Sequence, residues 1–203
     1  MKLTLDWNCV IAVEEKHPQA TCVLELVDWH RKGEFEVALL AASASENNRS
    51  KRFPGSAKSF TERVERLGWR ELPLVPMPAV TSLTYIDYSY QVADGEKFKN
   101  DLQALWEVIA PRINQRPKDH LPTGTKLTDD AIQSDQLSKW RNAWCDVISA
   151  YSHIHEGRDI FVTNNIKDFQ HNAKRLLQLG MRCIATPKGA LAAARKLGSS
   201  QSH

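Results

Sequence analysis

The chain has 203 residues, of which 42% are hydrophobic and 25% are charged. This is the composition of an ordinary globular protein, and it excludes a disordered or fibrous chain. The 27 basic and 24 acidic side chains leave a formal net charge of +3, which is compatible with a nucleic-acid partner but does not require one.

The four cysteines give no sign of a zinc site or a disulfide framework. They form no Cys-x-x-Cys pair, and none stands beside a histidine at zinc-ligand spacing. We therefore expect buried free thiols in a reducing cytoplasm. The first residues lack the apolar core of a signal peptide, and no apolar run is long enough to span a bilayer. The expected localisation is cytoplasmic, with no membrane partner.

The first third of the chain predicts strand, helix, strand and helix in turn. Residues 3–5 are a short apolar run that stops at Asp6, which predicts a first strand. A helix with apolar residues on one face follows and ends at Gly33. Residues 37–42 predict a second buried strand, and residues 59–67 predict another helix.

The middle of the chain has a different character from about residue 69 onward. Residues 86–92 alternate as in an edge strand, and residues 98–109 have the spacing of a helix. Residues 114–127 are rich in proline, glycine and lysine, which predicts a loop. We therefore expect residues 70–127 to be an insertion, and to carry the choice of substrate.

The last third gives the clearest pattern. Thr128 is an N-cap candidate for a long helix that ends at Gly157. Residues 159–163 then predict a strand, residues 169–179 a helix and residues 181–185 a final strand.

Strands that alternate with helices are typical of one fold class. They predict a three-layer α/β/α sandwich with a central parallel sheet. We expect a single domain over residues 1–197, followed by a polar, mobile tail at residues 198–203.

Polar residues follow several of the predicted strands. Asp6 ends the first strand, and Glu46 follows the second. Asn165 and Asp168 follow a later strand. Ligands of an open parallel sheet bind beyond the carboxyl ends of its strands, so these side chains are expected to converge. Asp146 interrupts the apolar face of the long helix, where a lone carboxylate is costly unless something satisfies it.

Taken singly, each of these acids is more often a turn residue or a solvated residue than a functional one. Taken together, carboxylates that share one crevice repel one another. A hard divalent cation relieves that repulsion, and a set of oxygen ligands suits Mg²⁺ or Mn²⁺. The pattern thus favours a metal-dependent hydrolytic site.

The order of these segments resembles that of PIN-domain nucleases, in particular their toxin-like branch. Three stretches carry the resemblance: Leu3-Thr-Leu-Asp6-Trp-Asn8, Ala42-Ser-Ala-Ser-Glu46, and Asp146-Val-Ile-Ser-Ala-Tyr151 with the later Thr163-Asn-Asn165 and Asp168-Phe169. The match covers roughly residues 1–65 and 130–185 and leaves out the middle. The order and spacing of the motifs, rather than any single one, make the case.

The resemblance implies a fold and an activity. Asp6, Glu46, Asp146 and Asp168 would be the catalytic acids and the ligands of Mg²⁺ or Mn²⁺. The reaction would be hydrolysis of an RNA phosphodiester bond, in which the metal activates water and stabilises charge on the phosphate. The partners would be the RNA substrate and, for a toxin, an inhibitory antitoxin protein, while the oligomeric state stays open, with a homodimer as one candidate.

One position departs from the family pattern. Asn165 stands where some members carry an aspartate, and its carbonyl oxygen can bind a metal but brings no charge. Whether Asn165 or Asp168 completes the metal site stays open. Asn8 would support Asp6 by hydrogen bonding, and Thr163 would be a second support near the strand end.

A nuclease must also hold a polyanion beside its acidic site. Arg49, Lys51 and Arg52 follow Glu46 and are candidates for contacts with RNA phosphates, as is Arg141 in the long helix. For each of them, an ordinary solvated position is an equal alternative.

Aromatic and histidine side chains give weaker evidence for a nucleic-acid site than the acids do. Tyr85, Tyr88 and Tyr90 could stack on bases, although packing is the favoured interpretation of an aromatic stripe. His153 and His155 are expected to be ordinary surface residues, and no histidine is needed as a base.

Two other functions remain open. A catalytically degenerate PIN-like domain would bind RNA or a protein without cutting, and the neutral Asn165 keeps this alternative. A haloacid-dehalogenase-like phosphatase also begins with an aspartate after its first strand. That chemistry requires a second aspartate two residues later, where this chain has Asn8.

Overall fold

Five parallel strands form the central sheet of this computed structural model, which describes residues 1–46, 53–54 and 56–200. Their bounds are Lys2–Leu5 for β1, Glu36–Leu40 for β2, Leu74–Val75 for β3, Ile160–Val162 for β6 and Ile184–Ala185 for β7. The spatial order is β3-β2-β1-β6-β7, and each pairing is parallel. The predicted parallel sheet is confirmed.

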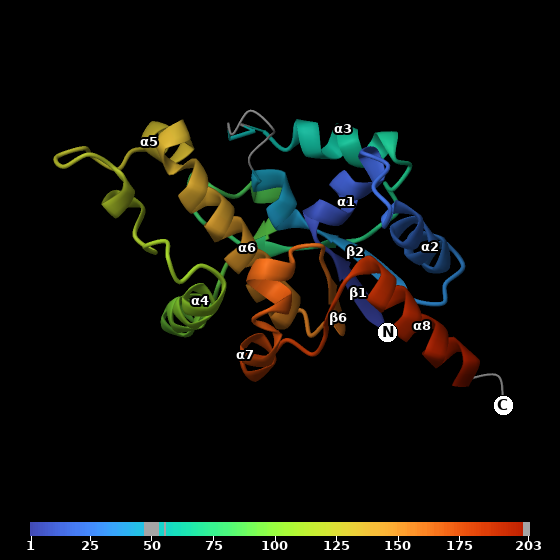
Figure 1. The fold of residues 1–203 in the computed structure, drawn as a ribbon. Helices are drawn as coiled ribbons and strands as arrows, with labels where there is room; N and C mark the ends of the chain where they lie inside the picture. The colour runs from blue at the N-terminus through green and yellow to red at the C-terminus, as the bar shows by residue number, and fades with distance from the viewer. Residues whose placement is uncertain (47–52, 55, 201–203) are drawn as a thin grey trace.

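Helices cover both faces of this sheet (Figure 1). One face carries α1 (Trp7–Glu14), α2 (Ala20–Arg31), α3 (Lys58–Arg66) and α8 (Pro187–Ser200). The opposite face carries α4 (Gly95–Ile109), α6 (Ser138–His155) and α7 (Ala173–Gln178). Side chains of β2 alternate between two buried clusters. Leu39 packs in the cluster under α1, α2, α3 and α8, and Leu40 packs in the cluster under α4, α6 and α7. The three-layer α/β/α architecture is therefore confirmed.

Helix α1 was not predicted from the sequence. It begins directly after Asp6, whose Oδ1 accepts a hydrogen bond from the backbone N–H of Trp7 at 2.8 Å. An aspartate at this position satisfies an N–H group that the first turn would leave without a partner. Asp6 therefore ends β1 and begins α1, so no loop separates the two elements.

The long helix expected from Thr128 is divided in two. The Thr128 hydroxyl accepts a bond from the N–H of Ala131 at 3.2 Å and caps α5 (Asp129–Gln133), but α6 starts only at Ser138. The side chain of Arg141 is 0% exposed, and its Nη1 donates to the carbonyl oxygens of Ile132 and Ser134 at 2.7 and 2.5 Å. Arg141 thus holds the break between the helices, and its burial argues against the phosphate contact expected for it.

Residues 70–127, which the sequence suggests are an insertion, pack against the rest of the fold. Strand β3 is an edge of the main sheet, and α4 packs on α6 with the Trp106 and Trp140 ring centroids 6.2 Å apart. The edge strand expected over residues 86–92 is mostly wrong. The chain forms a 3-10 turn at Ile86–Tyr88, followed by the two-residue β5 (Ser89–Tyr90). β5 pairs with β4 (Met77–Pro78) in a separate small sheet.

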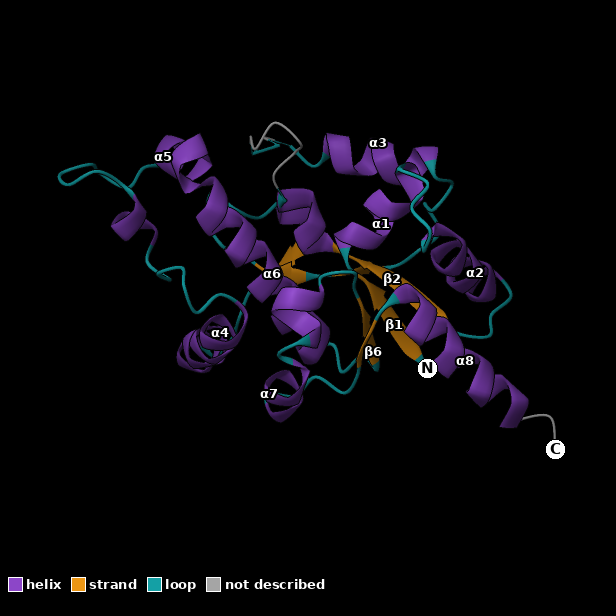
Figure 2. Cartoon of the chain, in the orientation of Figure 1, coloured by secondary structure: helices purple, strands orange, loops and turns teal. Residues whose placement is uncertain are grey.

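The last described helix reaches into the expected tail. Helix α8 continues to Ser200, so residues 198–200 are helical, and residues 201–203 lie outside the described residues. Figure 2 shows this helix beside the sheet, while the chain between α4 and α5 extends away from it as an arm. In the part of the chain that the structure describes, no helix combines the length and apolar character needed to cross a membrane.

A buried polar network surrounds Thr4 of β1. Arg158 donates to the Thr4 hydroxyl at 2.8 Å, to the Leu3 carbonyl at 2.6 Å and to Glu36 at 2.6 Å. His153 is 0% exposed and lies 2.9 Å from the same hydroxyl, so the expectation of a surface position is wrong. Burial, reinforced by the nearby Arg158 charge, lowers the pKa of His153 to about 3.

His153 makes the fold sensitive to acid. Its pKa is lower in the folded than in the unfolded chain, so the unfolded chain binds more protons, and stability falls as the pH drops below about 6.5. We expect His153 to remove about 2 kcal/mol from the free energy of unfolding between pH 6.5 and pH 5. Urea unfolding at several pH values measures this. His153→Gln should lose this part of the pH dependence, and His155→Gln, at an exposed position, should keep it. Equal pH dependence in both variants would contradict the assignment.

Candidate active site

Asp6 is fixed at the carboxyl end of β1 by three hydrogen bonds. Its side chain is 4% exposed. Oδ1 accepts from the Trp7 N–H, and Oδ2 accepts from the Asn8 amide at 2.5 Å and from the Thr163 hydroxyl at 2.6 Å. Burial raises the pKa of Asp6, while the bonds from Thr163, Trp7 and Asn8 oppose that rise. The two residues expected to support Asp6 both bond to its carboxylate.

The same bonds join two strands that are far apart in the sequence. Asn8 donates to the Thr163 hydroxyl at 2.9 Å, and its Oδ1 accepts from the N–H of Asn164 at 2.8 Å. The Asp6 N–H also donates to the Val162 carbonyl at 2.9 Å. The Asp6 carboxylate therefore has a single orientation, set by the ends of both β1 and β6.

Glu46 and Asp146 are held quite differently. Glu46 follows the 3-10 turn Ala41–Ser45 after β2, and Asp146 lies midway along α6. Among the described residues, neither carboxylate has a hydrogen-bond or ion-pair partner. Unpartnered carboxylates at half-buried positions are costly. Both are therefore open to a ligand of positive charge.

The acids affect one another electrostatically. Burial raises the pKa of Glu46 well above its ordinary value, and the charges of Asp6 and Asp146 raise it further, while Arg63 lowers it. Burial also raises the pKa of Asp146, together with the charges of Asp6 and Asp168. The four acids that the sequence singled out thus face a common region, although they come from four separate segments.

Asp168 and Asn165 share one short structure. The Asn165 amide donates to Asp168 Oδ2 at 3.0 Å, and Asn165 Oδ1 accepts from the Asp168 N–H at 3.2 Å, which caps the π-helical turn Ile166–Gln170. Both polar ends of Asn165 are therefore engaged by Asp168. Of these two residues, Asp168 is the one whose charge acts on Asp146, and Asn165 orients it.

The carboxylates do not form a closed ligand set as they stand. Within residues 1–46, 53–54 and 56–200, no group of three or more His, Cys, Asp or Glu side chains lies close enough to hold a metal ion. Asp6, Glu46, Asp146 and Asp168 are thus within electrostatic reach of one another but are spaced more widely than metal ligands.

Several of the expected nucleic-acid contacts come from the segment after Glu46. Arg49, Lys51 and Arg52 lie outside the described residues. Of the tyrosines considered for base stacking, Tyr88 packs on Phe60 with ring centroids 6.0 Å apart, as the packing interpretation predicts.

Four cations near the acids were not singled out from the sequence. Arg63 pairs with Glu14, lies over the ring of Trp7 at 4.5 Å and faces Glu46. The other three line a cleft beside Asp146 and Asp168, and they are Arg112, Lys139 and Lys167. The spacing of Lys139 and Asp146, seven residues apart in one helix, was a usable signal. Arg63 and Arg112 have no local signal, since tertiary packing places them.

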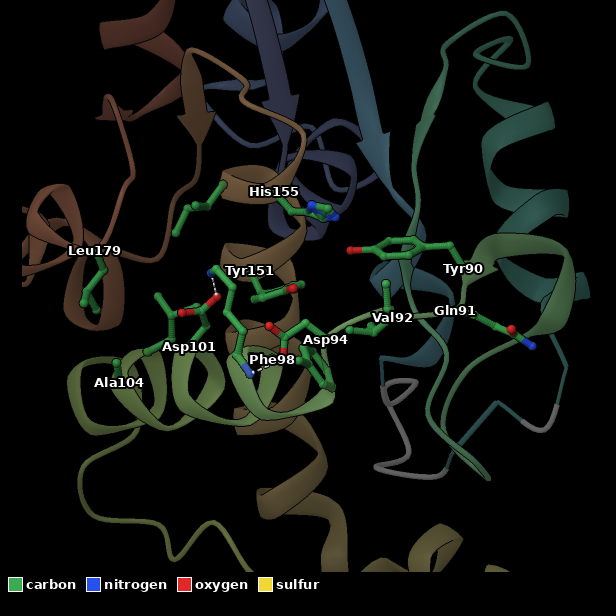
Figure 3. Close-up of a pocket in the computed structure, with 14 residues that line it drawn as sticks. Tyr90, Gln91, Val92, Asp94, Phe98, Asp101, Ala104, Tyr151, His155 and Leu179 are labelled. Atoms are coloured by element: carbon green, nitrogen blue, oxygen red, sulfur yellow. Dashed lines mark hydrogen bonds and ion pairs between the residues drawn. The ribbon is translucent and has the colours of Figure 1, made fainter.

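A larger cavity, of about 530 Å³, lies away from these acids (Figure 3). It is enclosed by α4, the end of α6 and the chain after β5, and its rings are Tyr90, Phe98, Tyr151 and His155. Among the described residues that line this cavity, Lys97 and Asp101 form an ion pair with each other. None of the predicted site residues lines this cavity, so it is separate from the acids described above.

Fold and site together define a three-layer α/β/α protein with an acidic site at the carboxyl end of its parallel sheet. Comparison with family models, with curated proteins and with solved structures gives no match to this chain. The resemblance to PIN-domain nucleases therefore rests on the sequence motifs alone.

Repulsion at this site predicts that one substitution stabilises the metal-free protein. Asp146→Asn removes a charge that faces Asp6 and Asp168, so the free energy of unfolding at pH 7 should rise by about 1 kcal/mol. The Asp146 pKa is raised in the folded state, so its penalty is present at high pH and disappears as the pH falls toward 3.8. Urea unfolding in a chelator measures the change.

The matched control for this substitution is Asp119→Asn, at an exposed position. It should change the free energy of unfolding by less than about 0.5 kcal/mol. A loss of stability in Asp146→Asn would show that its carboxylate is satisfied in the folded protein.

Proposed function

We propose that this protein is a metal-dependent nuclease that hydrolyses phosphodiester bonds at the site of Asp6, Glu46, Asp146 and Asp168. The observation that carries the proposal is the pair of unpartnered carboxylates, Glu46 and Asp146, beside a third that is rigidly held. Such an arrangement is unfavourable without a cation and becomes favourable with one.

The donor set suits Mg²⁺ or Mn²⁺. All four acids offer carboxylate oxygens, which are the ligands that hard divalent cations prefer. Asp6 Oδ2 already accepts two hydrogen bonds, so Oδ1 is its freer oxygen. Binding requires the side chains of Glu46 and Asp146 to move closer to Asp6 than they stand in this structure.

Each part of the chain has a role in this proposal. A bound divalent ion would lower the pKa of a water molecule and neutralise charge on the scissile phosphate. Asp6, held by Asn8 and Thr163, gives the site a fixed point. Glu46 and Asp146 supply oxygens for which the described residues offer no hydrogen-bond or ion-pair partner. Asp168, oriented by Asn165, adds negative charge on the side of Asp146.

The resemblance to PIN-domain nucleases makes the proposal more specific. It points to RNA as the substrate and to an antitoxin protein as an inhibitory partner, and a homodimer is one candidate assembly. A reducing compartment such as the cytoplasm agrees with the four cysteines, which are all free thiols.

A second function is favoured by the spacing of the acids. A domain that binds nucleic acid without cutting it would need no closed metal site, and none is formed by the described side chains. A neutral Asn165, where some PIN-domain nucleases carry an aspartate, fits this alternative as well. Cleavage separates the two functions directly.

The nuclease proposal predicts cleavage that depends on both a metal and the acids. Purified protein is incubated with single-stranded RNA in Mg²⁺, in Mn²⁺ and in a chelator. Cleavage should occur only with metal, and Asp6→Asn and Asp146→Asn should each slow it by at least about 100-fold, because each loses a charged ligand.

Asp119→Asn, far from the acids in the sequence and exposed, serves as the control and should cleave at the wild-type rate. RNA that is bound but left intact under every metal condition would favour the binding function. Metal-dependent cleavage that persists in both aspartate variants would contradict the site assignment.

A further inference from the structure

A cleft of about 440 Å³ opens beside two of the proposed catalytic acids. Its walls come from three separate parts of the chain: the end of α4 with the turn that follows, one face of α6, and the π-helical turn after β6. Asp146 and Asp168 both line it. The cleft is therefore continuous with the carboxylate site.

Three exposed cations also line this cleft, namely Arg112, Lys139 and Lys167. Among the described residues, none of the three takes part in an ion pair. Other basic side chains of the chain are engaged, for example Arg158 with Glu36 and Arg195 with Glu25. Three cations without partners around one cleft are available to an external anion.

The cations are spaced for an extended anion rather than a single small one. Lys139 and Asp146 are separated by seven residues of α6, which is about 10 Å along the helix axis. Lys167 directly precedes Asp168. One cation thus lies beside the acids while another lies two helical turns away, as a chain of phosphates would require.

The turn that carries Arg112 is held by two tryptophans. The indole N–H of Trp106 donates to the Ile113 carbonyl at 2.6 Å, and that of Trp140 donates to the Gln115 carbonyl at 2.9 Å. These bonds secure the backbone just after Arg112 against α4 and α6. Arg112 therefore projects from a supported turn, within the segment that the family resemblance leaves out.

We propose that this cleft binds a single nucleic-acid strand through its phosphates, with Arg112, Lys139 and Lys167 as the contacts and with Trp106 and Trp140 as positioning residues for Arg112. Whether the bound strand is cleaved rests on the proposed function, but the binding of the strand does not. The volume of the cleft is within the range of small-ligand pockets, so we expect it to take one strand rather than a duplex.

The test measures binding without cleavage. A labelled single-stranded RNA of about 12 nucleotides is titrated with protein in a chelator, and fluorescence anisotropy is followed between 50 and 200 mM salt. Replacing Arg112, Lys139 and Lys167 together by Ala should weaken binding at least about tenfold. The slope of log K against log salt should shrink by about 2, since each lost phosphate contact removes about 0.7.

The matched control removes the same charge elsewhere. Lys32, Arg66 and Lys188 are exposed and lie on or after helices of the opposite face, and their joint replacement by Ala should leave the affinity within about twofold. Equal weakening by the two triple variants would overturn the proposal, because net charge alone would then explain binding. Equally tight binding of a duplex of the same length would overturn the single-strand assignment.

The positioning role has its own readout. Trp140→Phe keeps an aromatic ring but loses the indole donor, so it should weaken binding in the wild type and have no further effect when Arg112 is already Ala. Additive effects would contradict that role. Cleft-dependent binding with no cleavage in any metal would leave this proposal standing and reject the nuclease. Metal-dependent cleavage that is unchanged when the three cations are replaced would reject this proposal and support the nuclease.

Discussion

The hydrogen bonds that Asp6 Oδ2 accepts from Asn8 and Thr163 are the contact on which the site depends. They tie the end of β1 to the end of β6, two strands that are paired in the sheet but separated by most of the chain. Because Asp6 also caps α1, the same carboxylate fixes the start of a helix on one face. The remaining acids are arranged around this fixed point.

Those remaining acids show how a site can conflict with stability. Glu46 and Asp146 are kept at half-buried positions by the elements that carry them, although no described residue forms a hydrogen bond or an ion pair with either carboxylate. Two buried clusters, one on each face of the sheet, contribute the apolar burial that offsets this unfavourable term. A local conflict of this kind is typical of functional sites, where binding of the proper ligand relieves it.

Much of the fold could be predicted, because strand and helix periodicity is local. The acids at strand ends were found for the same reason, since a parallel sheet brings those ends together. Helix α1 was not predicted because its N-cap, Asp6, is also the residue at which the strand pattern stops. Arg141 and His153 were misjudged because a polar residue in a helix is usually solvated. Their burial depends on partners elsewhere, namely the carbonyls of Ile132 and Ser134 for Arg141 and the hydroxyl of Thr4 for His153.

The central claim is that these acids hold a divalent cation, and Mn²⁺ binding followed by electron paramagnetic resonance tests it most directly. In a titration of the protein, the signal of free Mn²⁺ should fall as the ion is bound, and added Mg²⁺ should restore it by competition. Asp146→Asn should weaken binding at least about tenfold, because it loses a charged ligand. A free Mn²⁺ signal that is unchanged by millimolar wild-type protein, or binding that is equally tight in Asp146→Asn, would contradict the account.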